Sequence, residues 1–340
     1  MRLLFKLLLC AMVFGIGTAQ ADEPATKEAP DQPPSRLLVV TVTKGFRHGS
    51  IQTAEPVLEE LGRTSGLFHV DFLKSGDNEQ FAKAFELESL ANFDGVIFAS
   101  TTGNLPIPDL PGFMEWIRGG KAFIGIHAAT DTLGGSDAYC EMVGGSFAGH
   151  PWGGGDESGF VVQEPTHRLT AMFPQRFRWK DEIYQYDKRF QPENLRVLIS
   201  LDMSASNKRE PWHVPVSWIR DYGKGRVFYT NLGHNDATWK DVVFQKHLTE
   251  GIAWALGRFD APSKANPDTQ AAEYLRSVLA VAANALGKNP DDYRVKADAK
   301  IAADPTWATG LRPMLLEIRE MKPPARAETY TKLIDEIEKP

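Results

Sequence analysis

Cysteine is scarce in this chain of 340 residues, which contains only Cys10 and Cys140. Cys10 falls in an apolar N-terminal segment that we expect to be removed, so the mature protein would keep one thiol. No internal disulfide could then form, even in an oxidising compartment. The fold must therefore be stabilised by an ordinary hydrophobic core, and the chain is long enough to build one.

The sequence also lacks clustered basic charge and a second long apolar run. Its 44 Asp and Glu residues outnumber its 38 Lys and Arg residues. No basic block stands out, which argues against a nucleic-acid partner. No segment after the N-terminus is apolar enough to span a membrane. These absences favour an exported globular protein with neither nucleic acid nor a membrane span.

The N-terminus itself has the three parts of a signal peptide. Arg2 and Lys6 supply positive charge, residues 7–17 are apolar, and Ala19-Gln20-Ala21 is a small-residue cleavage site. We expect a signal peptide over residues 1–21 and a periplasmic or secreted mature protein. Residues 22–35 are rich in proline and charge and poor in large apolar side chains, which predicts a disordered linker.

Apolar runs alternate with helical patterns in the first half of the chain. The pattern predicts strands at 36–42, 68–73, 95–99 and 122–126, and helices at 51–61, 81–90 and 111–119. This alternation is typical of right-handed βαβ units and a mainly parallel sheet. Ligands bind beyond the carboxyl ends of such strands. We therefore expect three segments to meet at one edge of the sheet: residues 44–48, 100–104 and 127–131.

The second half of the chain has a different pattern. Strand-like runs occur at 159–163, 196–201, 214–220 and 226–230, with Lys224-Gly225 predicting a hairpin between the last two. A helix is expected over 242–256. Apolar residues at helical spacing then predict a helical C-terminal region over 265–340, with about three helices broken near Pro290 and Pro323-Pro324.

Several motifs, in order, resemble those of the ThuA-like (trehalose utilisation) family: TKGFRHGSI, DGVIFASTTGNL, IGIHAATDT, GGSFAGHPW, DEIYQYD and PVSWIRDYGKGRVFYTNLGHN. The resemblance covers about residues 36–258 and leaves the helical C-terminal region outside. It implies a flavodoxin-like α/β fold, a three-layer sandwich of the class I glutamine amidotransferase type. The family name implies a role in handling trehalose or related sugars, including their 3-keto forms.

The likeness to amidotransferases does not carry their reaction to this chain. Those enzymes need a thiol nucleophile at a strand-to-helix elbow, and His127 occupies that position here. Cys140 lies downstream in a predicted helix, beside Met142 and Val143, and we interpret it as a small buried hydrophobic residue. Glutaminase activity is therefore not expected.

Four residues are candidates for catalysis. His127 follows the central predicted strand, Asp131 lies in the same loop, and His234 lies just past another strand end. Glu182 alternates with Tyr184 and Tyr186, so all three share one face of an extended segment. That segment is either a half-buried strand or a source of an acid that reaches the pocket. A histidine with a carboxylate partner suits general acid–base chemistry.

Other polar and aromatic residues near these positions are candidates for substrate binding. Lys44 or Arg47 would bind an oxyanion or keto oxygen, and the aromatic rings would stack on a sugar face. The predicted substrate-binding residues are Lys44, Arg47, His48, Thr102, His150, Trp152, Tyr184 and Tyr186.

A divalent metal is one candidate cofactor, because imidazole and carboxylate groups ligate zinc and similar ions. The sequence has no His-x-x-x-His motif, so the fold would have to assemble the site from His48, His127, His150 and His234. Two functions stay open at this point. One is a carbohydrate-active enzyme that uses histidine/carboxylate or metal-assisted chemistry, and the other is a non-catalytic sugar-binding module. Both take a small sugar as ligand, and the sequence leaves the reaction, the sugar and the oligomeric state open.

Overall fold

The computed structural model describes residues 32–74 and 77–340. The predicted signal peptide, residues 1–21, and most of the predicted linker lie outside the described residues. Within the described ranges, no helix combines the length and apolar character needed to cross a membrane.

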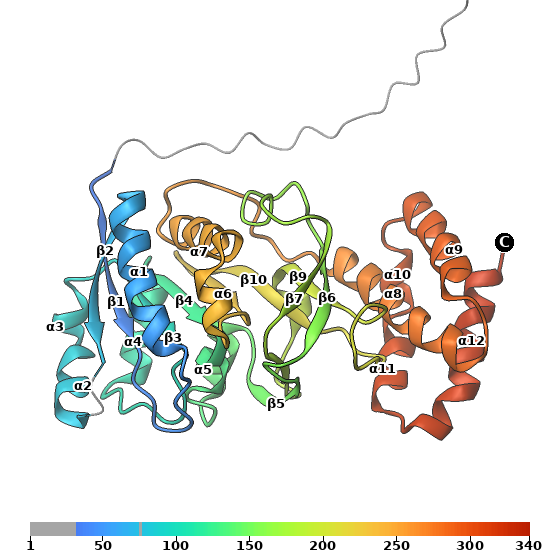
Figure 1. Cartoon of the computed structure of the whole chain (residues 1–340), viewed down its shortest axis with the longest axis horizontal. Coiled ribbons are helices and arrows are strands. Elements are labelled where there is room, and N and C mark those ends of the chain that lie inside the picture. The colour runs from blue at the N-terminus through green and yellow to red at the C-terminus, as the bar shows by residue number, and fades with distance from the viewer. Residues whose placement is uncertain (1–31, 75–76) are drawn as a thin grey trace, which may run out of the picture.

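Nine strands of the described chain form one sheet, in the order β2-β1-β3-β4-β11-β10-β9-β6-β7 (Figure 1). The first five run parallel to one another, and every later neighbouring pair is antiparallel. The parallel strands are β1 (Ser35–Val40), β2 (Phe68–Leu73), β3 (Gly95–Ala99), β4 (Ala122–Ile126) and β11 (Gly225–Thr230). With β11 in fifth place, their order is that of flavodoxin-like folds, so the predicted α/β fold class is confirmed.

The antiparallel half of the sheet is built from the strand-like runs of the second half of the chain. Its strands are β6 (Glu157–Val162), β7 (Arg176–Lys180), β9 (Arg196–Asp202) and β10 (Pro215–Tyr222). Tyr222 pairs with Gly225 across the tight turn between β10 and β11, which confirms the predicted hairpin. Two further strands, β5 (Phe147–Trp152) and β8 (Ile183–Tyr186), form a separate two-stranded sheet.

Helices cover both faces of the parallel strands, because alternate side chains of each strand enter different cores. In β1, Leu37 and Val39 pack in the core that contains α1 and α7, whereas Leu38 and Val40 pack with α2, α4 and α5. The bounds of these helices are α1 (Ile51–Ser65), α2 (Asn78–Ala84), α4 (Leu110–Arg118), α5 (Asp137–Val143) and α7 (Val242–Ala255). Each fully buried aliphatic or aromatic side chain contributes about 1.5–3 kcal/mol of transfer free energy. The result is the predicted three-layer arrangement.

The helix expected over 81–90 is instead two short helices, α2 and α3 (Leu87–Leu90). The break falls at Phe85 and Glu86, where Glu86 has an extended backbone. Phe85 is fully buried and stacks on Phe81, with 4.6 Å between ring centroids. The spacing of apolar residues predicted one continuous helix here, but the chain breaks where the Phe85 side chain is buried.

The C-terminal helices form a third core at the end of the molecule opposite β1 and β2 (Figure 1). Their bounds are α8 (Pro267–Ala285), α9 (Pro290–Ala303), α10 (Trp307–Gly310), α11 (Arg312–Glu320) and α12 (Arg326–Glu338). Helix breaks occur at Pro290 and Pro323, as predicted. Helix α8 contacts β9 and the 3-10 turn η2 (Pro192–Asn194) that precedes it. The helical region thus lies against the antiparallel half of the sheet.

Candidate metal centre

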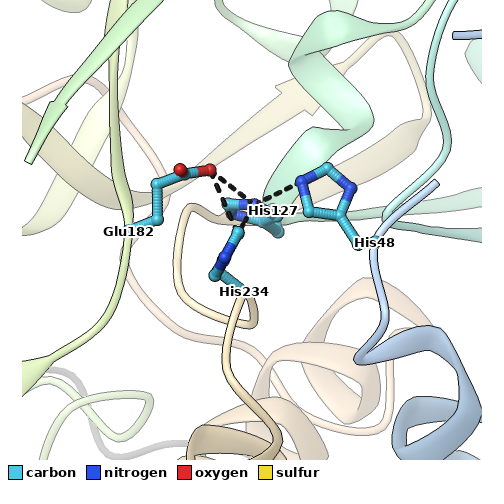
Figure 2. Close-up of side chains that lie close together, drawn as sticks. All are labelled: His48, His127, Glu182 and His234. Atoms are coloured by element: carbon cyan, nitrogen blue, oxygen red, sulfur yellow. Dashed lines mark hydrogen bonds and ion pairs between the residues drawn. The ribbon is translucent and has the colours of Figure 1, made fainter. Parts of the chain in front are cut away.

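Four side chains from distant parts of the chain point toward one another at the carboxyl edge of the parallel strands (Figure 2). His48 lies between β1 and α1, and His127 follows β4 directly. His234 lies between β11 and α6 (Asp236–Lys240), and Glu182 lies between β7 and β8. Three parallel strand ends thus supply the imidazoles, while the antiparallel half supplies the carboxylate.

The nitrogen and oxygen atoms of this cluster are close enough to share one ion. His127 Nε2 lies 3.2 Å from His48 Nε2 and 3.3 Å from His234 Nδ1. Glu182 Oε2 lies 3.1 Å from His234 Nδ1 and 3.5 Å from His127 Nε2. One ligand atom from each of the four residues falls within 4.8 Å of every other.

These separations fit a small divalent ion. Zinc binds histidine nitrogen at about 2.0–2.1 Å, and tetrahedral geometry then separates neighbouring ligand atoms by about 3.3 Å. Three imidazoles and one carboxylate are a donor set suited to zinc and similar divalent transition metals. The four residues present therefore fit a metal ion in both chemistry and spacing.

His127 occupies the tight turn from β4 into the 3-10 helix η1 (His127–Asp131). Its φ is +51°, in the left-handed region that non-glycine residues rarely adopt. The Tyr229 hydroxyl donates to the His127 carbonyl at 2.7 Å, which holds this turn in place. The elbow position inferred from the sequence is thus a real backbone feature, and a histidine is displayed on it.

The neighbourhood of His127 also fixes which ring nitrogen is free. Nδ1 lies 2.8 Å from the backbone carbonyl of Asn231. A carbonyl oxygen can only accept, so Nδ1 carries the proton, and Nε2 of the neutral ring is left with its lone pair facing the cluster. Backbone carbonyls orient metal-binding histidines in this way in many proteins.

Burial and charge adjust the protonation of the other members. Burial lowers the pKa of His48 to about 3, and the neighbouring His127 and His234 act in the same direction. Burial alone would raise the pKa of Glu182, but the neighbouring imidazoles of His127 and His234 lower it overall. At neutral pH the cluster therefore presents a neutral His48 imidazole and an ionised Glu182, which are the ligand forms that bind metals.

Asp181 holds the loop that carries His234. It is buried, and its two carboxylate oxygens accept the backbone N–H groups of Gly233 at 2.7 Å and Asn235 at 2.9 Å. Gly154 lies against the His234 ring, where an added Cβ would come within 2.7 Å of the His234 Cδ2 atom. The position of His234 is therefore set from both sides.

Asn231 joins the end of β11 to β8. Its Oδ1 accepts the backbone N–H of Tyr184 at 3.2 Å, and its Nδ2 donates to the Tyr186 hydroxyl at 2.6 Å. Since its own carbonyl also orients His127, this one residue connects the elbow to the segment that begins with Glu182.

His150 and Asp131 lie beside the cluster without belonging to it. The His150 side chain is 57% exposed, and its Nδ1 lies 3.3 Å from Glu182 Oε1. The predicted metal set named His150, but the structure places Glu182 among the four converging residues instead. Asp131 ends η1, where burial raises the pKa of its carboxyl and nearby His127 partly offsets the shift.

The aromatic residues that were predicted to stack on a sugar are buried. Trp152 is fully buried in the core that contains α7, so the expectation that it stacks on a sugar is wrong. Tyr186 is also buried, and its hydroxyl accepts a hydrogen bond from Asn231 Nδ2. Tyr184 is buried too, but its hydroxyl lies 3.3 Å from His48 Nε2. The alternation of these residues predicted a shared face but could not show whether that face is covered.

The remaining predicted binding residues lie in or beside the loop after β1. Lys44 Nζ donates to Asn78 Oδ1 at 2.7 Å, and the exposed Arg47 donates to the Thr41 carbonyl at 2.9 Å. Thr102 is buried, and its hydroxyl donates to the Phe46 carbonyl at 2.8 Å. Thr102 therefore fixes the loop that carries Phe46 and His48.

Sequence reasoning missed three residues that shape the site. Phe46 is 68% exposed, and its ring contacts that of His48 at a centroid distance of 4.9 Å. The sequence could have indicated Phe46, because it lies only two residues before His48. Asp181 and Asn231 had weaker signals, since a buried acceptor for a distant loop is visible only after folding. Cys140 is buried in α5, as predicted.

The fold and the site define a flavodoxin-like α/β protein with three histidines and one glutamate converging at the carboxyl edge of its sheet. A family model described as trehalose utilisation matches residues 36–255, and the chain belongs to this ThuA family.

Two solved structures are similar to this chain, and both are described as ThuA-like proteins. That from Parabacteroides merdae ATCC 43184 is 22% identical, with 66% of this chain and 90% of that chain covered and a TM-score of 0.53. That from Bacteroides uniformis ATCC 8492 is 21% identical, with 66% and 93% covered and a TM-score of 0.53. At this identity the likeness concerns the fold alone. No curated protein sequence matches the chain significantly.

Proposed function

We propose that this chain is an exported enzyme that acts on a trehalose-related or 3-keto sugar, using a divalent metal held by His48, His127, Glu182 and His234. The convergence of these four ligand atoms within 4.8 Å carries the proposal. Membership of the trehalose utilisation family supports the sugar as substrate class. A site that only bound a sugar would have no need for three imidazoles around one carboxylate.

The residues around the centre have distinct tasks in this proposal. A bound ion would supply a Lewis acid that polarises a sugar carbonyl or hydroxyl. Asn231 and Glu182 orient the imidazoles of His127 and His234. His150, exposed beside Glu182, holds or delivers a proton at its imidazole while the substrate is bound. Lys44 and Arg47 lie on the loop where a substrate oxygen would enter.

Turnover is expected to depend on both a metal and a keto sugar. The mature chain, treated with a chelator and reloaded with zinc, manganese or iron(II), is incubated with trehalose and 3-keto-trehalose. Product formation followed by NMR is expected only for a reloaded protein, with His150→Ala slowed by about 10²-fold or more. Saturable binding of the sugars without turnover under any metal would instead indicate the binding module.

We expect the exposed ring of Phe46, rather than the buried ring of Trp152, to stack on the sugar beside the metal centre. Its backbone carbonyl accepts a hydrogen bond from the Thr102 hydroxyl, and its side chain is exposed to solvent. Phe46→Ala should raise KM by about 5- to 10-fold, as expected for loss of roughly 1–1.5 kcal/mol of stacking, with kcat changed less than 2-fold. Phe46→Tyr is the matched control and should keep the wild-type KM. An unchanged KM in the alanine variant would remove Phe46 from the binding surface.

Export is expected from the N-terminal segment, whose charge and apolar run are those of a signal peptide. The protein recovered from the periplasm or medium should begin at Asp22. Its intact mass measures this directly, and a cytoplasmic protein that retains residues 1–21 would contradict it.

A further inference from the structure

A cavity lies between the ThuA-like domain, residues 36–255, and the C-terminal helices, and no part of the proposed chemistry uses it. Its volume is about 550 Å³, within the range of small-molecule sites. One wall comes from β8 and the segment after it, and the other comes from α8 and α11.

The cavity and the metal centre both lie near β8 but share no residue. The Tyr184 hydroxyl reaches His48, whereas the next residue, Gln185, lines the cavity together with Ala148 of β5. Tyr186 of the same strand also lines the cavity, but none of the four residues of the metal centre does. The two sites are therefore distinct.

The chemistry of the lining is both aromatic and polar. His213 and Tyr274 stack at the wall with 5.8 Å between ring centroids. Burial lowers the pKa of His213 to about 3, and Arg312 and Arg319 act in the same direction, so this ring is neutral at physiological pH. The wall also contains Gln270, whose buried Oε1 has no hydrogen-bond partner among the described residues. An unsatisfied buried acceptor is unfavourable unless a donor reaches it.

The charges of the lining balance. Its acidic and basic members are Asp187, Glu193 and Glu320, and Lys188, Arg312 and Arg319. Arg312 Nη2 forms an ion pair with Glu193 Oε2 at 2.6 Å. Among the described residues, the ion-pair partner of Arg319 is the exposed Glu320, with 3.7 Å between Nε and Oε1. Equal numbers of both signs do not select an ionic ligand, but planar amide and guanidinium groups beside aromatic rings suit a ligand with many hydroxyls.

We infer that this cavity is a second saccharide-binding site, formed jointly by the ThuA-like domain and the C-terminal helices and selective for neutral mono- or disaccharides. It goes beyond the proposed reaction, because it requires neither the metal nor turnover. Its role would be to hold a sugar, or the second unit of a longer one, next to the domain that performs the chemistry.

Calorimetric titration of the full mature chain with trehalose, maltose and glucuronate tests this site. The key protein is His127→Ala, which lacks a ligand of the metal centre but leaves the cavity intact. It should still bind trehalose or maltose with about one site per chain and should bind glucuronate at least tenfold more weakly. Leu316→Trp, which fills the cavity, and Arg319→Ala, which removes a donor, should each weaken this binding at least tenfold in the same background.

A matched control comes from α9, outside the cavity. Val295 is an exposed aliphatic residue of α9, as Leu316 is of α11, but it does not line the cavity. Val295→Trp should bind the sugars as its parent does, and thermal melts should show all variants folded. The inference is overturned if the His127→Ala protein binds neither neutral sugar, if Leu316→Trp and Arg319→Ala bind as their parent does, or if glucuronate binds best. None of these results bears on whether the wild-type protein turns over a sugar with metal bound.

Discussion

Replacing His127 is expected to abolish stable metal binding. The purified mature protein should retain close to one divalent ion per chain after dialysis, and His127→Ala should retain less than a tenth of that. His127 is the central member of the cluster, since its Nε2 lies within 3.5 Å of ligand atoms from all three partners. Loss of a direct ligand should cost more than the 10- to 100-fold in affinity that is typical of residues behind the ligands. Elemental analysis by mass spectrometry measures the content.

Two further variants separate ligand loss from damage to the fold. Alanine at φ +51° carries a backbone cost of about 1–2 kcal/mol. His127→Asn avoids much of this cost, because asparagine is enriched in the left-handed region. His69→Ala removes an exposed imidazole on β2, outside the cluster, and should keep the wild-type metal content. A metal-free wild-type protein, or an equally loaded His127→Asn protein, would exclude the proposed centre.

Replacing Asp181 is expected to produce the largest loss of stability with a simultaneous loss of metal affinity. Asp181→Ala removes the acceptor of the buried Gly233 N–H and of the partly buried Asn235 N–H, at up to about 1–3 kcal/mol each. We expect the free energy of unfolding to fall by about 2–4 kcal/mol. Because His234 lies between these two residues, metal affinity should fall by about 10- to 100-fold. Urea unfolding and competition with a fluorescent chelator measure the two effects.

The isosteric variant identifies the cause. Burial raises the pKa of Asp181, which means that the folded protein disfavours its charge. Asp181→Asn keeps one acceptor oxygen and removes that charge, so it should lose less than half as much stability as the alanine variant. Asp156→Ala removes a partly buried acceptor of the Gly153 N–H in a turn and should change stability by less than about 1 kcal/mol. Equal losses for all three variants would show that Asp181 has no special role in holding the His234 loop.

The sequence predicted the parallel half of the fold well, because buried parallel strands are continuous apolar runs that end abruptly in polar loops. That pattern also predicts that His48 and His127 lie at one edge of the sheet. The pattern could not predict that Glu182 lies beside these histidines. Glu182 follows a strand of the antiparallel half, and the pairing of those strands depends on long-range contacts. Burial was the second limit. Trp152 and Phe46 are both aromatic residues close to a histidine in the sequence, yet one lies in the core and the other in solvent.

The ligand set crosses the boundary between the two halves of the sheet. Three imidazoles follow parallel strands, and the carboxylate lies just after an antiparallel one. A bound ion would therefore cross-link side chains that span residues 48 to 234 of the chain, in a protein whose described residues contain a single cysteine, Cys140, which is free. At a metal concentration 100-fold above Kd, binding to the folded state alone would add about 2.7 kcal/mol of stability. The availability of metal in its surroundings would then set the protein's resistance to unfolding as well as its proposed chemistry.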